Sequence, residues 1–289
     1  MANKIYPCLW YDGKAKEAAE FYCSVFENAK ITADTPMVVT FEIFGKKIMG
    51  LNGGPMFEIN PSISLFVLLE TVEKTNAAWE KLAEGGKVLM PIDKYFWSER
   101  YGWVQDKYGM TWQISVVNQA GDKPTLTPSL LFTGDRFGKA EEAVNLYCSL
   151  FKNSSIDVMM HYPEDDPSAG KVMFSECKLD GYNLIAMDGP GEHKYSFSEG
   201  VSLVVECKDQ DEVDFFWNNL IADGGAESMC GWLKDKFAVS WQIVPEALGK
   251  LMSDPDQERA GRVMQVLMKM KKLVIADLEN AAEGKTVSA

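Results

Sequence analysis

A long sequence phrase occurs twice in this chain, once in each half. The first copy runs from Gly102 to Ile114 (GWVQDKYGMTWQI) and the second from Gly231 to Ile243 (GWLKDKFAVSWQI), 129 residues later. An earlier pair, FYCSVF at residues 21–26 and LYCSLF at residues 146–151, repeats at an interval of 125 residues. Solenoid and propeller repeats are only about 20–50 residues long, so each copy here is a whole domain. The chain of 289 residues therefore predicts two homologous domains in tandem.

The first quarter of the chain predicts one strand, one helix and three further strands. Residues 5–11 are typical of a strand that stops at Asp12-Gly13, and apolar side chains at helical spacing follow over residues 15–26. Strands are then expected at residues 28–35, 37–44 and 47–51. The same order recurs three more times, so the sequence predicts four βαβββ modules laid end to end.

Four segments follow from this repeat. We predict a first domain at residues 1–119, a linker at residues 120–127, a second domain at residues 128–248, and a C-terminal amphipathic helix and tail at residues 249–289. The linker is rich in residues that favour turns. The final helix, expected over residues 256–273, has one apolar face and either packs on the second domain or clamps domains or subunits together.

The two halves differ in their loops. The segment that leads to the repeated Gly-Trp phrase is ten residues longer in the first half, where it contains Tyr95, Phe96 and Trp97. The early loop of the second half is longer and acidic, and contains His161. We therefore expect the two halves to have diverged in use.

Charge and cysteine content exclude several classes of partner. The chain has 29 Lys and Arg against 42 Asp and Glu, a net charge of −13, so its field repels nucleic-acid phosphates and anionic lipids. The six cysteines show no Cys-x-x-Cys pair, and no apolar run approaches the ~18 residues of a membrane helix. The N-terminus enters a strand-forming segment without the parts of a signal peptide. We expect a soluble, cytoplasmic protein with no nucleic-acid or membrane partner.

The repeated modules, with their phrases, resemble the vicinal oxygen chelate superfamily of glyoxalase, bleomycin-resistance and extradiol dioxygenase relatives, and specifically its PhnB-like branch. The resemblance covers nearly the whole chain and rests on residues 7–13, 17–22, 51–55, 102–103, 106–114 and the helix around 261–272. It implies a mixed α+β fold of two tandem domains, each a curled eight-stranded sheet of two βαβββ modules, with helices outside and a cavity inside. Modules in this superfamily pair within a domain or between subunits, so a homodimer stays open.

Members of this branch often carry the label of a demethylubiquinone methyltransferase, which the residues do not favour. Most enzymes that use S-adenosylmethionine bind it on a glycine-rich turn between a strand and a helix. Gly53-Gly54-Pro55 follows a strand but leads to Met56-Phe57-Glu58 rather than into a helix.

Metal enzymes of the resembled superfamily hold a divalent ion with His and Glu from inward positions of the first, middle and last strands. The aligned positions here carry Gln113 and Gln242 on the last strands, Ser64 and Ser202 on the middle strands, and Tyr6, Cys8 or Ser129 on the first strands. These are poor ligands for zinc, nickel or iron. The two histidines, His161 and His193, fall in loops. No cofactor is therefore expected, and a divalent metal held by Glu42 or Glu176 is the alternative.

The remaining candidates are aromatic and amide side chains, which bind flat or cationic organic molecules by stacking and cation–π contact. The candidate ligand-binding residues are Trp10, Asn52, Trp97, Trp103, Trp112, Gln113, Trp232, Trp241 and Gln242. Trp and Gln at alternating strand positions fit a protein core equally well. Asp106-Lys107 and Asp235-Lys236 are expected to form exposed hairpin turns.

The leading hypothesis is a metal-independent small-molecule-binding protein whose partner is an organic, aromatic ligand. The alternative is a divalent-metal enzyme of glyoxalase, dioxygenase or lyase type, with catalytic residues that the sequence does not assign. In a third interpretation one domain is only a structural partner for the other.

Overall fold

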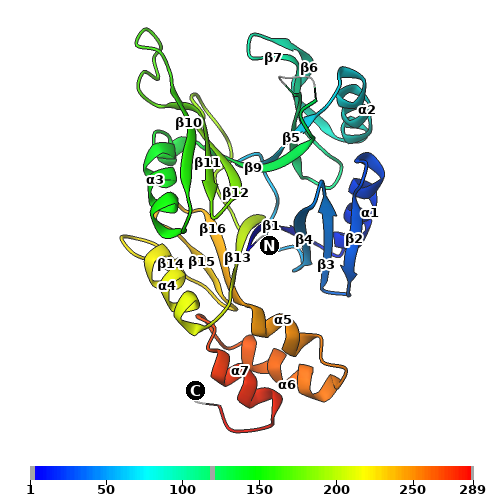
Figure 1. The fold of residues 1–289 in the computed structure, drawn as a ribbon, viewed down its shortest axis with the longest axis vertical. Helices are drawn as coiled ribbons and strands as arrows, with labels where there is room; N and C mark the ends of the chain where they lie inside the picture. The colour runs from blue at the N-terminus through cyan, green and yellow to red at the C-terminus, as the bar shows by residue number, and fades with distance from the viewer. Residues whose placement is uncertain (1–3, 118–120, 288–289) are drawn as a thin grey trace. The chain divides into compact units, whose positions relative to one another are not determined.

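Four βαβββ modules and three short C-terminal helices make up the fold (Figure 1), as predicted for the modules. The computed structural model describes residues 4–117 and 121–287. The first module consists of β1 (Ile5–Tyr11), α1 (Ala15–Val25), β2 (Lys30–Asp34), β3 (Val38–Ile43) and β4 (Lys46–Asn52). The second consists of β5 (Ile63–Leu69), α2 (Val72–Ala83), β6 (Lys87–Tyr95), β7 (Ser98–Gln105) and β8 (Thr111–Val116).

The third and fourth modules repeat this order. The third consists of β9 (Thr125–Phe132), the short 3₁₀ helix η1 (Gly134–Arg136), α3 (Ala140–Leu150), β10 (Ser155–His161), β11 (Val172–Leu179) and β12 (Tyr182–Asp188). The fourth consists of β13 (Val201–Cys207), α4 (Gln210–Leu220), β14 (Ala226–Glu227), β15 (Trp232–Lys234) and β16 (Ser240–Pro245). No helix among the described residues has the length and apolar character needed to cross a membrane.

Strand pairing joins modules from the two halves of the chain. The second and third modules form one eight-stranded sheet, in the order β10-β11-β12-β9-β5-β8-β7-β6. At its centre β5 runs antiparallel to β9 and parallel to β8, which places Ser64 opposite Ser129 and Phe66 beside Gln113. The strands of the first and fourth modules have the order β14-β15-β16-β13-β1-β4-β3-β2. Mixed eight-stranded sheets of two modules each are thus confirmed, and the described strands close into no barrel.

The chain divides into two compact units, and the division falls inside β1. The larger unit covers residues 7–201, while Ile5 and Tyr6 belong with the residues from Ser202 onward. β1 is hydrogen-bonded within each unit, since the Glu206 amide donates to the Lys4 carbonyl over 2.8 Å and the Trp10 amide to the Gly200 carbonyl over 3.0 Å. The domain boundaries taken from the repeat stay a prediction. Of the predicted linker, residue 120 lies outside the described residues and residues 125–127 begin β9.

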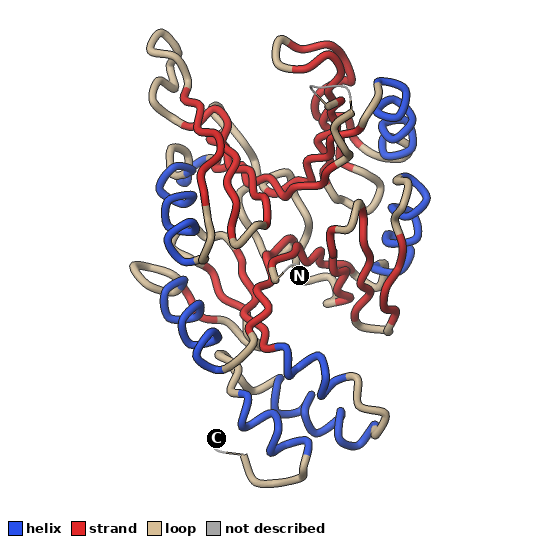
Figure 2. Tube along the Cα trace, in the orientation of Figure 1, coloured by secondary structure: helices blue, strands red, loops and turns tan. Residues whose placement is uncertain are grey.

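The C-terminal segment folds as three helices instead of the single one predicted. They are α5 (Glu246–Met252), α6 (Gln257–Leu267) and α7 (Ile275–Ala282), which Figure 2 shows as a group of short blue segments. Val263, Leu267 and Leu273 are buried together with α7, so the predicted apolar face is a core. The helix ends early because the carbonyls of Met270 and Lys271 accept hydrogen bonds from the amides of Cys230 and Gly231.

The repeated Asp-Lys turns are built around buried aspartates. Asp106 Oδ1 accepts hydrogen bonds from the amides of Tyr108 (2.8 Å) and Met110 (3.1 Å), and Oδ2 accepts one from Trp112 Nε1 (2.7 Å). Asp235 makes the same three bonds, the last of them with Trp241 Nε1 at 2.9 Å. The two aspartates are 4% and 2% exposed. The prediction of exposed turns is therefore wrong for these carboxylates, because each one organises its turn from the inside.

Trp112 and Trp241 lie in the core. Both are fully buried, and Trp112 contacts the rings of Tyr22 and Phe26 at centroid distances of 4.9 and 5.2 Å. Of the two interpretations that the sequence left open for these tryptophans, the structure favours the core.

We expect Asp106→Asn to lower the free energy of unfolding by about 1–3 kcal/mol, because the new amide N–H₂ would face the Trp112 N–H and leave it without an acceptor. Asp235→Asn is expected to act alike. Urea unfolding measures both, with Asp165→Asn as an exposed control that stays within about 0.5 kcal/mol of wild type. An Asp106 variant as stable as wild type would contradict this role.

Stability is also expected to depend on pH through Asp106. Burial raises the pKa of this carboxyl from 3.8 to about 6, against the lowering effect of its hydrogen bonds. The folded protein therefore holds this proton more tightly than the unfolded chain, so the contribution is complete below pH 3.8 and is lost as the pH rises through about 6. As the pH rises from 3.8 to about 6, the free energy of unfolding of wild type should fall more than that of Asp106→Asn, because the asparagine side chain does not titrate in this range. Parallel urea curves at the two pH values test this, and a constant difference between the proteins would refute it.

Candidate ligand-binding site

The candidate site lies on the face of the larger unit's sheet opposite α2. α2 packs on β7 and β8, and Gly102 lies so near the Trp79 ring that a Cβ atom there would come within 2.5 Å of it. Side chains alternate across a strand, so Tyr101 and Trp103 point away from α2. Trp103 pairs with Gln113 in the β7–β8 ladder, which places these three residues on one face.

Gln113 is the centre of a buried polar cluster. Its Nε2 donates to Ser64 Oγ (2.7 Å) and Ser129 Oγ (3.4 Å), and its Oε1 accepts from the Tyr101 hydroxyl (2.8 Å). Burial raises the pKa of Tyr101 well above its usual range, so the hydroxyl stays a neutral donor. The aligned strand positions in this sheet therefore do converge, as three neutral side chains that satisfy one another. In the smaller unit Gln242 Nε2 donates to Ser202 Oγ over 2.9 Å, which repeats the central bond.

An aromatic cluster of Phe66, Tyr95, Trp97 and Tyr101 adjoins this amide. Tyr95 and Trp97 stack at a centroid distance of 4.9 Å, and both meet the Tyr101 ring edge-on, at 5.6 and 5.7 Å. Phe66 lies 6.3 Å from Tyr101 on the other side. Trp97 is 46% exposed, so the cluster reaches the surface. The extra residues of the first half thus form the end of the β6–β7 hairpin and carry half of this cluster.

Trp103 stands beside Gln113 with an unused donor. Its Nε1 is buried and has no hydrogen-bond partner among the described residues, although a buried indole N–H normally has one. Trp232 occupies the same place in the smaller unit, opposite Gln242.

Two further predicted residues lie elsewhere. Asn52 fixes the start of α1, since its Oδ1 accepts from the Ala15 amide (2.9 Å) and its Nδ2 donates to the Pro36 carbonyl (2.8 Å). Its contacts are those of a structural cap. Trp10 lines a separate cavity of ≈ 640 Å³.

The alternative metal ligands have other partners. Glu42 pairs with Lys30 at 3.3 Å, and Glu176 accepts from Asn183 Nδ2 at 2.8 Å. His161 lies 3.1 Å from Glu141 on the surface, and His193 contacts the Pro190 carbonyl at 3.0 Å. Across residues 4–117 and 121–287, no three His, Cys, Asp or Glu side chains gather in a way that could hold a metal ion.

Sequence reasoning missed Phe66, Tyr95 and Tyr101 as parts of this site. The aromatic content of the ten-residue extension was a signal for Tyr95. Phe66 and Tyr101 gave no such signal, because each also fits an ordinary strand position.

Comparison with known proteins identifies relatives of the chain. A family model described as 3-demethylubiquinone-9 3-methyltransferase matches it twice, at residues 3–115 and 124–244. A Bacillus cereus protein with the names PhnB and 3-demethylubiquinone-9 3-methyltransferase is 33% identical over 38% of this chain and 96% of its own, with a TM-score of 0.36. Protein YjdN of Escherichia coli strain K12 is 35% identical over 78 residues, 27% of this chain and 53% of that protein, so the chain spans about half the length of this curated relative.

Glyoxalase I from Zea mays shares the fold. It is 12% identical over 87% of this chain and 96% of its own, with a TM-score of 0.59.

Asn52→Ala is expected to cost about 0.5–2 kcal/mol of stability through loss of the α1 cap, without a change in ligand binding. Asn52→Asp keeps the accepting oxygen and should be milder; Asp188 fills this role in the third module, where it accepts from the Gly138 and Ala140 amides. Thermal melts and ligand titrations measure the two effects. Weaker ligand binding by a stably folded Asn52→Ala variant would contradict this prediction and show that Asn52 takes part in ligand binding.

Proposed function

Since the chain belongs to the 3-demethylubiquinone-9 3-methyltransferase family, a group with the vicinal oxygen chelate fold, we propose that it is a metal-independent small-molecule-binding protein. The ligand is a flat organic molecule that stacks on the aromatic cluster of Phe66, Tyr95, Trp97 and Tyr101 and is oriented by the polar groups at Gln113 and Trp103. The observation that carries the proposal is this partly exposed cluster, which joins directly to a buried amide.

The aromatic cluster supports a flat ligand. Trp97 rests on Tyr95 and exposes 46% of its surface, so a second ring can add to an existing stack. Aromatic pairs of this kind contribute about 0.5–1.5 kcal/mol beyond their buried area. The edge contact between Trp97 and Tyr101 restrains the indole, which reduces the entropy lost on binding.

The polar groups beside the cluster support a ligand with a hydrogen-bond acceptor. Gln113 is held by Ser64 and Tyr101, so its amide is fixed before a ligand arrives. Trp103 Nε1 is a donor without a partner in the described residues, and a carbonyl or ring nitrogen of the ligand would satisfy it after a small rotation of the indole.

The donor set at the strand centre supports metal independence. An amide and two hydroxyls stand at the aligned positions and bond to one another, while divalent zinc, nickel and iron favour imidazole, thiolate and carboxylate. The residues present therefore do not fit the divalent ion of a glyoxalase-type or dioxygenase-type enzyme.

The glycines after β4 do not favour methyl transfer. Gly53 and Gly54 follow β4 and lead into turns and loop up to β5, so this glycine turn does not continue into a helix as in the common S-adenosylmethionine sites.

The test is a titration of the purified chain with flat aromatic ketones and amides, followed by tryptophan fluorescence, before and after treatment with a chelator. We expect saturable binding that chelation leaves unchanged and that Trp97→Ala weakens about 2- to 10-fold, the loss of one stacking contact. Trp103→Phe removes only the N–H and part of the ring. It should lower the affinity for ligands with a hydrogen-bond acceptor more than the affinity for ligands without one.

Trp232→Phe is the matched control, because it makes the same change in the other copy of the repeat and should leave this binding intact. Near-stoichiometric metal in untreated protein, with binding that chelation abolishes, would overturn metal independence. Ligands that bind the Trp97→Ala variant as tightly as wild type would overturn the site.

A further inference from the structure

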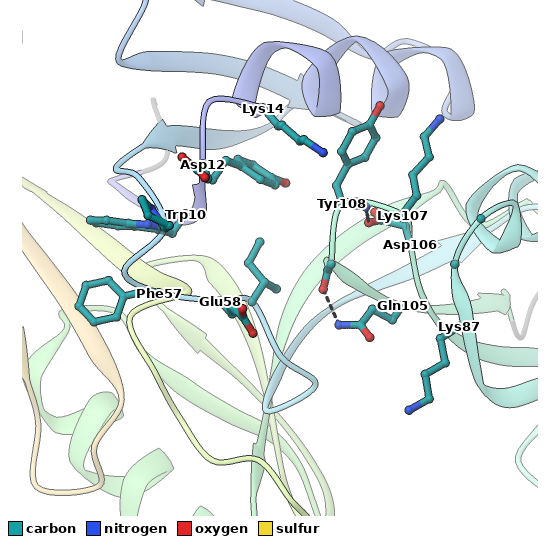
Figure 3. Close-up of a pocket in the computed structure, with 16 residues that line it drawn as sticks. Trp10, Asp12, Lys14, Phe57, Glu58, Lys87, Gln105, Asp106, Lys107 and Tyr108 are labelled. Carbon is teal, nitrogen blue, oxygen red and sulfur yellow. Dashed lines mark hydrogen bonds between the residues drawn. The ribbon is translucent and has the colours of Figure 1, made fainter.

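A cavity distinct from the aromatic cluster opens at the end of β1 (Figure 3). Its volume is ≈ 640 Å³, within the ~300–1,000 Å³ of small-molecule sites. Four segments line it: residues 10–14 at the junction of β1 and α1, residues 55–59 after β4, residues 85–87 before β6, and residues 105–109 at the β7–β8 turn. All of them belong to the larger unit. We propose that this cavity is a second binding site, for a small organic anion with a flat apolar group.

Trp10 forms a rigid apolar wall. Its Nε1 donates to the Gly54 carbonyl over 2.6 Å, and its ring meets Phe57 edge-on at a centroid distance of 4.9 Å. A Cβ atom at Gly53 would lie 2.2 Å from the indole, so only glycine leaves room for the ring in this position. The wall is therefore formed before any ligand binds.

The loop that carries Phe57 and Glu58 is also fixed. Asn60 Nδ2 donates to the Ser196 carbonyl over 3.0 Å, and Ser198 Oγ donates to the Glu58 carbonyl over 3.2 Å. Gly200 approaches the Glu58 carbonyl so closely that a Cβ atom there would lie 2.1 Å away. Such preorganisation lowers the entropy lost when a ligand is bound.

Three lysines supply the positive charge. Lys14, Lys87 and Lys107 line the cavity, and none of them forms an ion pair within the described part of the chain. Lys107 Nζ instead makes cation–π contacts, 4.6 Å from the ring centroid of Phe21 and 5.3 Å from that of Tyr108. Asp106 is bonded within its own turn, so three lysines face two carboxylates, Asp12 and Glu58, around the cavity, and in a chain of net charge −13 this local excess of positive charge favours an anionic ligand.

The acidic residues of the cavity fix the direction of such a ligand. Asp106 turns both oxygens to its own turn and to Trp112. In Figure 3, Asp12 and Glu58 lie on the side of Trp10 and Phe57, whereas Lys14 points toward Tyr108, and the side chains of Lys87 and Lys107 point in opposite directions. The anionic group therefore belongs between Lys14 and the β7–β8 turn that carries Lys107, with the flat group against Trp10 and Phe57.

The second copy of the repeat lacks most of these groups. Leu131 and Phe237 stand at the positions of Trp10 and Tyr108, while Lys236 matches Lys107. Lys236→Gln is thus a matched control for Lys107→Gln, since it removes the same charge from the same turn where no indole wall is present.

The experiment is calorimetric titration of the intact chain with naphthoate, naphthamide and naphthylmethylammonium, three probes with one ring system and different charge. We expect naphthoate to bind about tenfold or more tightly than naphthamide, the ammonium to bind most weakly, and added salt to weaken naphthoate. Lys107→Gln and Lys14→Gln should each lower the affinity for naphthoate about 3- to 10-fold, and Trp10→Phe should lower the affinity for all three probes. Lys236→Gln should change nothing.

Three outcomes would overturn the proposal. These are equal affinity for naphthoate and naphthamide, an equal effect of Lys236→Gln and Lys107→Gln, or no heat of binding from protein whose circular dichroism and melting are normal. Naphthoate binding that Trp97→Ala removes and Lys107→Gln spares would place the anion on the aromatic cluster instead. The two sites share no residue. If the cavity binds no anion, the proposed function at the aromatic cluster is unaffected. If the aromatic cluster binds no ligand, the proposal for the cavity is unaffected.

Discussion

The buried carboxylate of Asp106 is the interaction on which the larger unit most depends. Its three hydrogen bonds close the β7–β8 turn and hold the Trp112 indole. Trp112 in turn packs on Tyr22 and Phe26, so one side chain links the second module's sheet to the first module's helix. Burying a charge is costly unless hydrogen bonds replace the lost water, and here three donors offset part of that cost, since burial still raises the pKa of Asp106 to about 6. The chain repeats the device at Asp235 and Trp241.

The same turn positions both candidate sites. Asp106 fixes the turn that carries Lys107 and Tyr108 to the cavity, and the strands that leave this turn carry Trp103 and Gln113, the middle pair of the ladder. Gln113 is hydrogen-bonded at both ends of its amide, through Nε2 to Ser64 and through Oε1 to Tyr101. A polar centre of this kind keeps three buried strands in one register, because a shift by one residue would leave every partner unsatisfied.

Part of the candidate site could be predicted from the sequence. The resemblance to the vicinal oxygen chelate superfamily placed Gln113, Ser64 and Ser129 at the metal-ligand positions of the last, middle and first strands, and the structure brings these three side chains together. Trp112 could not be assigned, because alternation along a strand defines two faces without showing which one a helix covers. Asp106 was expected in an exposed turn, since polar turn residues usually face water, and its partners became visible only in three dimensions. The C-terminal helix was predicted too long because its apolar spacing continues past Leu267, while the carbonyls of Met270 and Lys271 bond to a distant loop.

The four βαβββ modules, their order and the different loop lengths of the two halves could all be predicted from the sequence, because they depend on local periodicity, turn residues and repeated phrases. The strand orders, in which β9 of the third module lies beside β5 of the second and β13 of the fourth beside β1 of the first, became visible only in the folded chain. An apolar strand face can pack against any of the other modules, so its sequence pattern does not show which module it pairs with. The cavity at Trp10 likewise depends on contacts between segments nearly 100 residues apart, such as Tyr108 with Glu17, 2.8 Å apart in the folded chain. Such contacts exist only once the chain has closed over these distances, and for that reason spacing along the sequence does not reveal them.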